Sequence, residues 1–258
     1  MNSDLRTWIF LRGLTRERRH WGGFIGQFQH ALPGRRVVAL DLPGNGRLYQ
    51  QCSPVRVQDM VAHCRAQLAL RNIEPPYGLL AMSLGAMVAV AWADAHPQEV
   101  AANVLINTSM RPFSPFYQRL RPPNYGALLK LAMLGAAPEV WERTVLRMTS
   151  NLATDAVLPR WLALRQQCPV SRANALRQLI AAARFRAPAV KPLAPTLVLA
   201  SEQDHLVSVE CSRALARHWQ CPLHVHAGAG HDLPLDDGYW VAAQVQEWLM
   251  AGPSFSVT

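Results

Sequence analysis

Three side chains that lie far apart in the sequence have the types and settings needed for nucleophilic catalysis. Ser83 lies in the run Ala81-Met82-Ser83-Leu84-Gly85. A serine hydroxyl is a poor nucleophile at neutral pH, so it requires a base within hydrogen-bonding reach and a third group that orients the base. Asp204 and His231 each follow a short apolar run and can supply these two roles. The predicted chemistry is attack of an activated serine on an acyl carbon.

The residues around Ser83 predict a sharp turn that exposes the hydroxyl. An apolar run at 77–80 precedes it and a helix-forming stretch at 84–96 follows. A strand, a tight turn with a serine and then a helix form a nucleophile elbow, in which small residues such as Ala81 and Gly85 relieve crowding. We expect the backbone N–H groups of Leu84 and of Leu14, in the loop after the first predicted strand, to form an oxyanion hole.

The sequence contains alternative candidates for the acid and the base. Glu202 lies two residues closer to the preceding strand than Asp204 and is the second candidate for the acid. Asp204 itself could instead cap the helix that follows it. His231 directly follows the small residues Gly228-Ala229-Gly230, in a loop that can carry an imidazole across the sheet to Ser83. The other eight histidines lack such a setting, although His205 could line the mouth of the site.

The elements that must position these residues follow an alternating pattern of strands and helices. Strands are predicted at 7–11, 37–40, 78–82, 104–107, 196–200 and 223–226, and helices at 17–32, 57–72, 84–96, 209–219 and 239–250. Several strands are apolar almost throughout, as in sheets that are covered on both faces. The pattern predicts an α/β fold with a mostly parallel sheet and helices on both faces.

The alternation breaks for about ninety residues between the fourth and fifth predicted strands. A structureless loop of that length is uncommon, and amphipathic patterns at 137–148 and 171–185 predict helices. We therefore expect a helical cap at 111–191, inserted into a core formed by 1–110 and 192–258. The substrate pocket would lie between the elbow and the cap, where Trp21, Met82, Thr108 and Phe113 are candidate lining residues by position alone.

Composition excludes several classes of function. No apolar stretch reaches the ~20 residues of a membrane span, and the N-terminal residues lack the apolar core of a signal peptide, so we expect a cytoplasmic protein. The five cysteines are scattered and odd in number, which favours reduced thiols. Neither metal-ligand spacing nor a glycine-rich phosphate loop is present, so we expect no metal and no cofactor.

The formal net charge of +9 has two readings, solubility with an arginine bias or attraction to an acidic partner. Nucleic-acid motifs are absent, so we expect no nucleic-acid partner. Most of the excess positive charge lies in the predicted cap, where basic residues outnumber the acidic residues Glu139, Glu142 and Asp155. These are Arg119, Arg121, Lys130, Arg143, Arg147, Arg160, Arg165, Arg172, Arg177, Arg184 and Arg186.

Over nearly its full length the chain resembles the α/β-hydrolase superfamily. The resemblance lies in Leu11-Arg12-Gly13-Leu14, Asp41-Leu42-Pro43-Gly44-Asn45-Gly46, Met82-Ser83-Leu84-Gly85-Ala86, Ser201-Glu202-Gln203-Asp204-His205 and Gly230-His231-Asp232-Leu233-Pro234. It is most similar to carboxylesterases of the pimeloyl-[acyl-carrier-protein] methyl ester esterase type. That resemblance implies a cofactor-free serine esterase acting on an acyl ester. It also implies an acidic acyl carrier protein as a partner for cap arginines such as Arg143 and Arg147.

The resemblance leaves the reaction and the assembly open. An acyl thioesterase, an acyltransferase or a non-catalytic binding protein could use the same fold, and the oligomeric state is undetermined. The chain also departs from the family pattern at three places. Arg12 replaces the usual histidine before the first-loop glycine, Ala81 replaces the first glycine of the elbow, and few residues precede the first strand, so we expect a sheet shortened at that edge.

Overall fold

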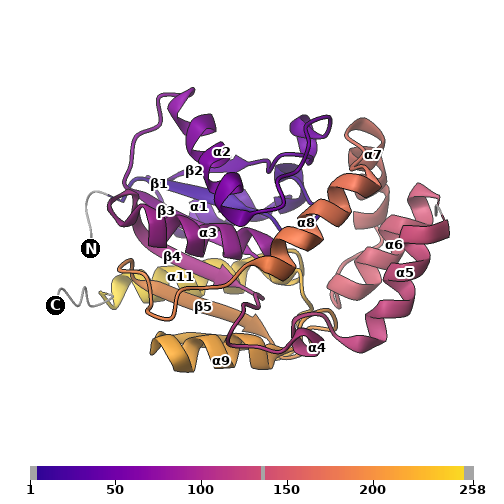
Figure 1. The fold of residues 1–258 in the computed structure, drawn as a ribbon. Helices are drawn as coiled ribbons and strands as arrows, with labels where there is room; N and C mark the ends of the chain where they lie inside the picture. Colours follow the sequence, from indigo (N-terminus) through magenta and orange to yellow (C-terminus); the bar gives the residue numbers. More distant parts are fainter. Residues whose placement is uncertain (1–4, 135–136, 253–258) are drawn as a thin grey trace.

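A computed structural model of the chain describes residues 5–134 and 137–252. Its centre is a parallel six-stranded sheet with the order β2-β1-β3-β4-β5-β6 (Figure 1). The strands are β1 (Thr7–Leu11), β2 (Arg36–Leu40), β3 (Tyr77–Met82), β4 (Val100–Ile106), β5 (Thr196–Ser201) and β6 (Leu223–His226). The predicted α/β fold with a parallel sheet is confirmed.

The apolar strands are buried on both faces because consecutive side chains point to opposite sides of the sheet. In β1, Trp8 and Phe10 join one hydrophobic cluster, while Ile9 and Leu11 join the other. The helices α1 (Phe24–Ala31) and α11 (Gly238–Met250) cover the first face. The opposite face is covered by α2 (Val57–Ala69), α3 (Leu84–Ala95) and α9 (Val209–Trp219).

The long segment between β4 and β5 is helical. It contains α4 (Phe116–Arg119), α5 (Tyr125–Leu134), α6 (Pro138–Thr149), α7 (Val157–Gln167) and α8 (Arg172–Arg184). Figure 1 shows α5 to α8 beyond the end of the sheet toward which the strand arrows point. The stretches predicted to be helical at 137–148 and 171–185 correspond to α6 and α8, and the Ser171 hydroxyl caps α8 by accepting from the Asn174 N–H.

Short helical turns complete the chain. They are η1 (Arg18–Trp21), η2 (Gly46–Leu48), η3 (Pro97–Glu99), η4 (Pro122–Asn124) and α10 (Leu233–Asp236). Within the two described ranges, no helix is long and apolar enough to cross a membrane.

The single helix predicted at 17–32 is wrong. Gly22 has a φ of +57° and separates η1 from α1, because a positive φ interrupts the helical hydrogen-bond pattern. This break turns Trp21 into the core, where its ring centroid lies 5.1 Å from that of Phe10 and 5.7 Å from that of Phe24. The strand predicted at 104–107 also begins earlier, because Val100 already pairs with Tyr77 of β3.

Candidate active site

Ser83 forms the sharp turn between β3 and α3. Its φ of 55° and ψ of −118° lie in a region that non-glycine residues rarely adopt, as expected for a strained turn at a functional site. The serine N–H donates to the Ile106 carbonyl at 3.0 Å, and the serine carbonyl accepts from Thr108 Oγ1 at 3.1 Å. The end of β4 therefore supports the strained backbone and leaves the Ser83 side chain partly exposed.

Two glycines allow the loop after β1 to approach this turn. A Cβ atom at Gly85 would clash with the Leu11 carbonyl oxygen and lie 2.7 Å from that of Arg12. A Cβ atom at Gly13 would lie 3.1 Å from Ser83 Cβ. The loop that carries Leu14 is therefore packed directly beside Ser83. Leu84 is the first residue of α3, a position whose N–H has no acceptor within the helix.

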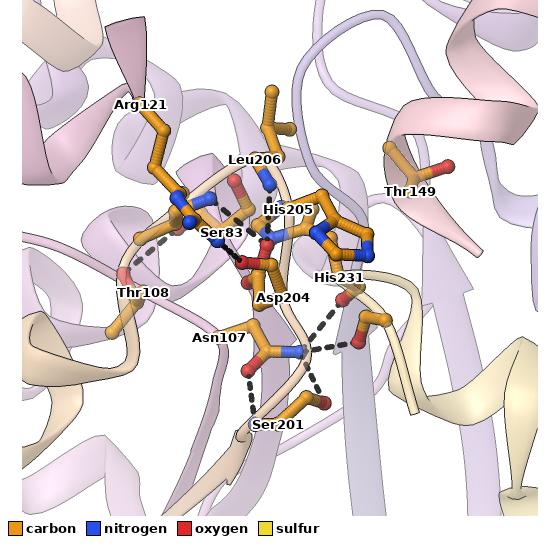
Figure 2. A network of polar contacts seen from close by, with 12 residues as sticks. Ser83, Asn107, Thr108, Arg121, Thr149, Ser201, Asp204, His205, Leu206 and His231 are labelled. Carbon is orange, nitrogen blue, oxygen red and sulfur yellow. Dashed lines mark hydrogen bonds and ion pairs between the residues drawn. The ribbon is translucent and has the colours of Figure 1, made fainter. Parts of the chain in front are cut away.

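His231 and Asp204 form a buried pair at the same end of the sheet (Figure 2). His231 Nδ1 lies 2.7 Å from Asp204 Oδ2, and the second carboxylate oxygen accepts from the N–H groups of Leu206 at 2.8 Å and Val207 at 2.9 Å. Because a carboxylate only accepts, the proton of a neutral His231 ring lies on Nδ1 and leaves Nε2 free as a base.

Among the described residues, no hydrogen bond joins the Ser83 hydroxyl to the His231 ring. In active sites without substrate such bonds are often long and shorten when substrate binds.

Asn107 links three parts of the site and was missed by the sequence analysis as a site residue. Its buried amide Nδ2 donates to the carbonyls of His231 at 2.8 Å and Gly230 at 3.2 Å, and to Ser201 Oγ at 3.0 Å. Its Oδ1 accepts from the Ser201 N–H at 2.8 Å (Figure 2). The signal available in the sequence was an amide side chain directly after the apolar run 104–106.

The segment between β4 and β5 is hydrogen bonded to the loop after β5 that carries Asp204, called here the acid loop. Arg121 Nη1 donates to the Asp204 carbonyl at 2.7 Å, and Asn124 Nδ2 donates to the His205 carbonyl at 2.7 Å. Figure 2 shows Arg121 reaching the acid loop. The backbone of Asp204 is thus fixed by residues that precede α5.

The same segment also binds the loop that carries His231. Asp236 accepts from the N–H groups of Gly230 at 2.7 Å and Asn151 at 3.0 Å, and from the Ser150 hydroxyl. The Asp232 N–H donates to the Thr149 carbonyl at 2.6 Å. The residues at the C-terminal end of α6 are therefore hydrogen bonded to Asp232 and Asp236, which follow His231 in this loop.

The remaining predicted site residues have other surroundings. Trp21 and Met82 are buried in the hydrophobic core, where Trp21 packs against the rings of Phe10 and Phe24. Phe113 packs against the rings of His218, in a tilted geometry, and Trp219, edge to face. Glu202 is largely exposed and pairs with Arg213 at 2.6 Å, far better suited to a surface role than to orienting a buried base.

The predicted basic cap is only partly a basic surface. Arg165 pairs with the buried Glu142 at 3.1 Å, and Arg177 donates to the Ser53 carbonyl at 2.5 Å. Arg143 and Arg147 are exposed on α6, where Arg143 also pairs with Glu139 at 2.6 Å. In the parts of the chain that the structure describes, no cluster of three His, Cys, Asp or Glu side chains is arranged to hold a metal ion.

Comparison with known proteins identifies the family. Residues 8–244 match the family model of the alpha/beta hydrolase family. The chain belongs to the α/β-hydrolase family. The hydrolase is 28% identical over 228 residues to the pimeloyl-[acyl-carrier protein] methyl ester esterase of Chromobacterium violaceum, an alignment that covers 88% of this chain and 78% of the relative.

Two further comparisons extend this result. The hydrolase is 28% identical over 247 residues to the biotin biosynthesis bifunctional protein BioHC of Cellvibrio japonicus, covering 88% of this chain but only 46% of that longer protein. The solved structure of a thermophilic esterase from Thermogutta terrifontis superposes with a TM-score of 0.72 at 20% identity, covering 96% of this chain and 91% of the esterase. At that identity the structural likeness establishes the fold alone.

Proposed function

We propose that this hydrolase cleaves a carboxylic ester through an acyl-enzyme formed on Ser83. The observation that carries the proposal is the 2.7 Å hydrogen bond between His231 Nδ1 and the buried Asp204 carboxylate, at the sheet end where Ser83 occupies a strained turn. An oriented base beside an exposed serine is the arrangement that activates a hydroxyl for acyl transfer.

In the proposed reaction, His231 Nε2 takes the hydroxyl proton as Ser83 Oγ attacks the acyl carbon. The N–H groups of Leu14 and Leu84 bind the oxyanion, and the Asp204 carboxylate stabilises the imidazolium. The imidazolium then protonates the leaving alcohol. Water, deprotonated by the same ring, attacks the acyl-enzyme, and collapse of the second tetrahedral intermediate releases the acid and restores the Ser83 hydroxyl.

The proposed substrate is an acyl methyl ester bound to an acidic carrier protein. The name of the Chromobacterium violaceum relative supports this substrate class, and the name of the Cellvibrio japonicus relative supports a place in biotin biosynthesis. The exposed Arg143 and Arg147, four residues apart on α6, would offer the carrier a basic surface. An acyl thioesterase is the second candidate, because the same arrangement of groups would attack a thioester carbonyl.

The reaction class is tested with a panel of nitrophenyl esters of increasing chain length, assayed beside acyl thioesters of matched chain length. We expect saturable ester hydrolysis with kcat/KM highest at one chain length, together with stoichiometric labelling by a fluorophosphonate. A kcat/KM higher for thioesters at every length would replace the esterase by a thioesterase. Lack of both turnover and labelling would leave a non-catalytic binding protein.

The carrier surface is tested by the double variant Arg143→Glu plus Arg147→Glu. We expect KM for a carrier-bound acyl methyl ester to rise about 10-fold, since charged residues at an interface mainly govern encounter and specificity. Hydrolysis of a small nitrophenyl ester should not change. Arg36→Glu plus Arg71→Glu alters net charge equally and is the matched control, because Arg36, the first residue of β2, and Arg71, which precedes β3, are exposed at the opposite end of the sheet. Equal effects of the two double variants would contradict docking on α6.

A further inference from the structure

A buried ion pair joins the loop after β1 to the loop that carries His231. Arg12 Nη1 donates to Asp232 Oδ1 at 2.9 Å, and Arg12 Nη2 contacts Asp232 Oδ2, so the guanidinium and the carboxylate face each other through two parallel hydrogen bonds. Both side chains are 2% exposed. We propose that Arg12 and Asp232 form a positioning pair that holds the oxyanion loop and the His231 loop in register for catalysis, an inference that rests on the proposed serine mechanism.

The positions of the two residues in the chain give the pair this role. Arg12 precedes Gly13, whose backbone packs against Ser83, and Leu14, whose N–H is a proposed oxyanion donor. Asp232 follows His231 directly. The ion pair is therefore one residue from the proposed base and two residues from the oxyanion donor, although the two partners lie 220 residues apart.

Contacts on both sides restrict the pair further. The Arg12 guanidinium lies over the Trp21 ring at 4.8 Å from its centroid, a cation–π geometry. The Asp232 N–H donates to the Thr149 carbonyl at the end of α6. A guanidinium presents two parallel donors in a fixed plane, so it sets both the distance and the angle between the two loops, whereas a lysine ammonium would supply a single point charge.

Burial makes a purely stabilising role a poor explanation. Removing two charges from water offsets most of their attraction, and buried ion pairs are often replaceable by apolar residues without loss of stability. Catalysis depends more steeply on geometry, because a misplacement of about 1 Å can lower the rate by roughly 100-fold. The pair should therefore affect kcat more than it affects stability when both partners are replaced together.

The test is a double-mutant cycle with Arg12→Met, Asp232→Leu and the double variant that carries both substitutions. For each variant kcat and KM are measured on a nitrophenyl ester, well below its Tm and per folded molecule. We expect each single variant to lose roughly 10- to 100-fold in kcat with KM within about 3-fold, and the double variant to lose about as much as the worse single variant. Arg12→Lys should recover part of kcat.

Arg65→Met is the matched control. Arg65 makes a two-pronged pair with Glu99, from α2 to η3, so its loss should leave kcat unchanged. If the single variants fail to fold, the proposal is decided by kcat of the double variant alone, because that variant leaves no buried charge unpaired. Wild-type kcat in the folded double variant, or multiplied losses across the cycle, would overturn the proposal. A wild-type protein that neither turns over esters nor reacts with fluorophosphonate would instead reject the serine mechanism itself.

Discussion

Ser83→Ala is expected to lower kcat for ester hydrolysis by about 10⁴- to 10⁶-fold, because removing a nucleophile eliminates the acyl-enzyme route. The fold should survive, since the side chain is partly exposed and the backbone of residue 83 is held by bonds to Ile106 and Thr108. Initial rates and fluorophosphonate labelling of purified protein measure the effect, with circular dichroism to verify folding.

Ser171→Ala is the matched serine control for this prediction. Ser171 caps α8, so its loss should reduce stability by about 1 kcal/mol while leaving kcat unchanged. Retention of more than a few per cent of wild-type kcat in Ser83→Ala would mean that another group performs the attack.

Asp204→Asn is expected to lower kcat by about 10⁴-fold with little change in KM. An asparagine that presents its amide N–H₂ to His231 Nδ1 would place the ring proton on Nε2, which could then no longer accept the Ser83 proton. Steady-state kinetics on a nitrophenyl ester measure the effect, with circular dichroism to verify folding.

Glu202→Gln supplies the control, because it is an equally small change two residues away. Its carboxylate is exposed and pairs with Arg213, so kcat should remain within about 2-fold of wild type, as is usual for a surface ion pair. Similar losses in the two variants would assign the orienting role to the whole loop rather than to Asp204.

Local pattern was sufficient to predict most of the framework. Apolar runs with short spacing identified the strands, and β1 and β6 end where the sequence indicated. Small residues around Ser83 predicted the turn that the structure contains, with Ala81 accommodated in the core. Strands and tight turns depend on residues that are close together in the chain, which is why they can be predicted from one sequence.

The parts that were missed depend on contacts between distant residues. Arg12 was recognised only as a departure from the family pattern, because nothing in the spacing of the sequence pairs it with Asp232. Asn107 likewise acts through loops that follow other strands. The break at Gly22 was missed for a different reason, since glycine in a helical pattern lowers helix propensity without fixing where the helix stops.

The Asp236 carboxylate accepts hydrogen bonds from residues 150–152, and the Asp232 N–H donates to the Thr149 carbonyl, so the end of α6 and the His231 loop form one structural unit. A chimera that exchanged residues 111–191 for those of another hydrolase would remove the acceptor and donors that this loop uses. Such an exchange should preserve turnover only if residues 230–236 are transplanted together with residues 111–191. Redesign of substrate selectivity in this protein therefore has to change the two segments together.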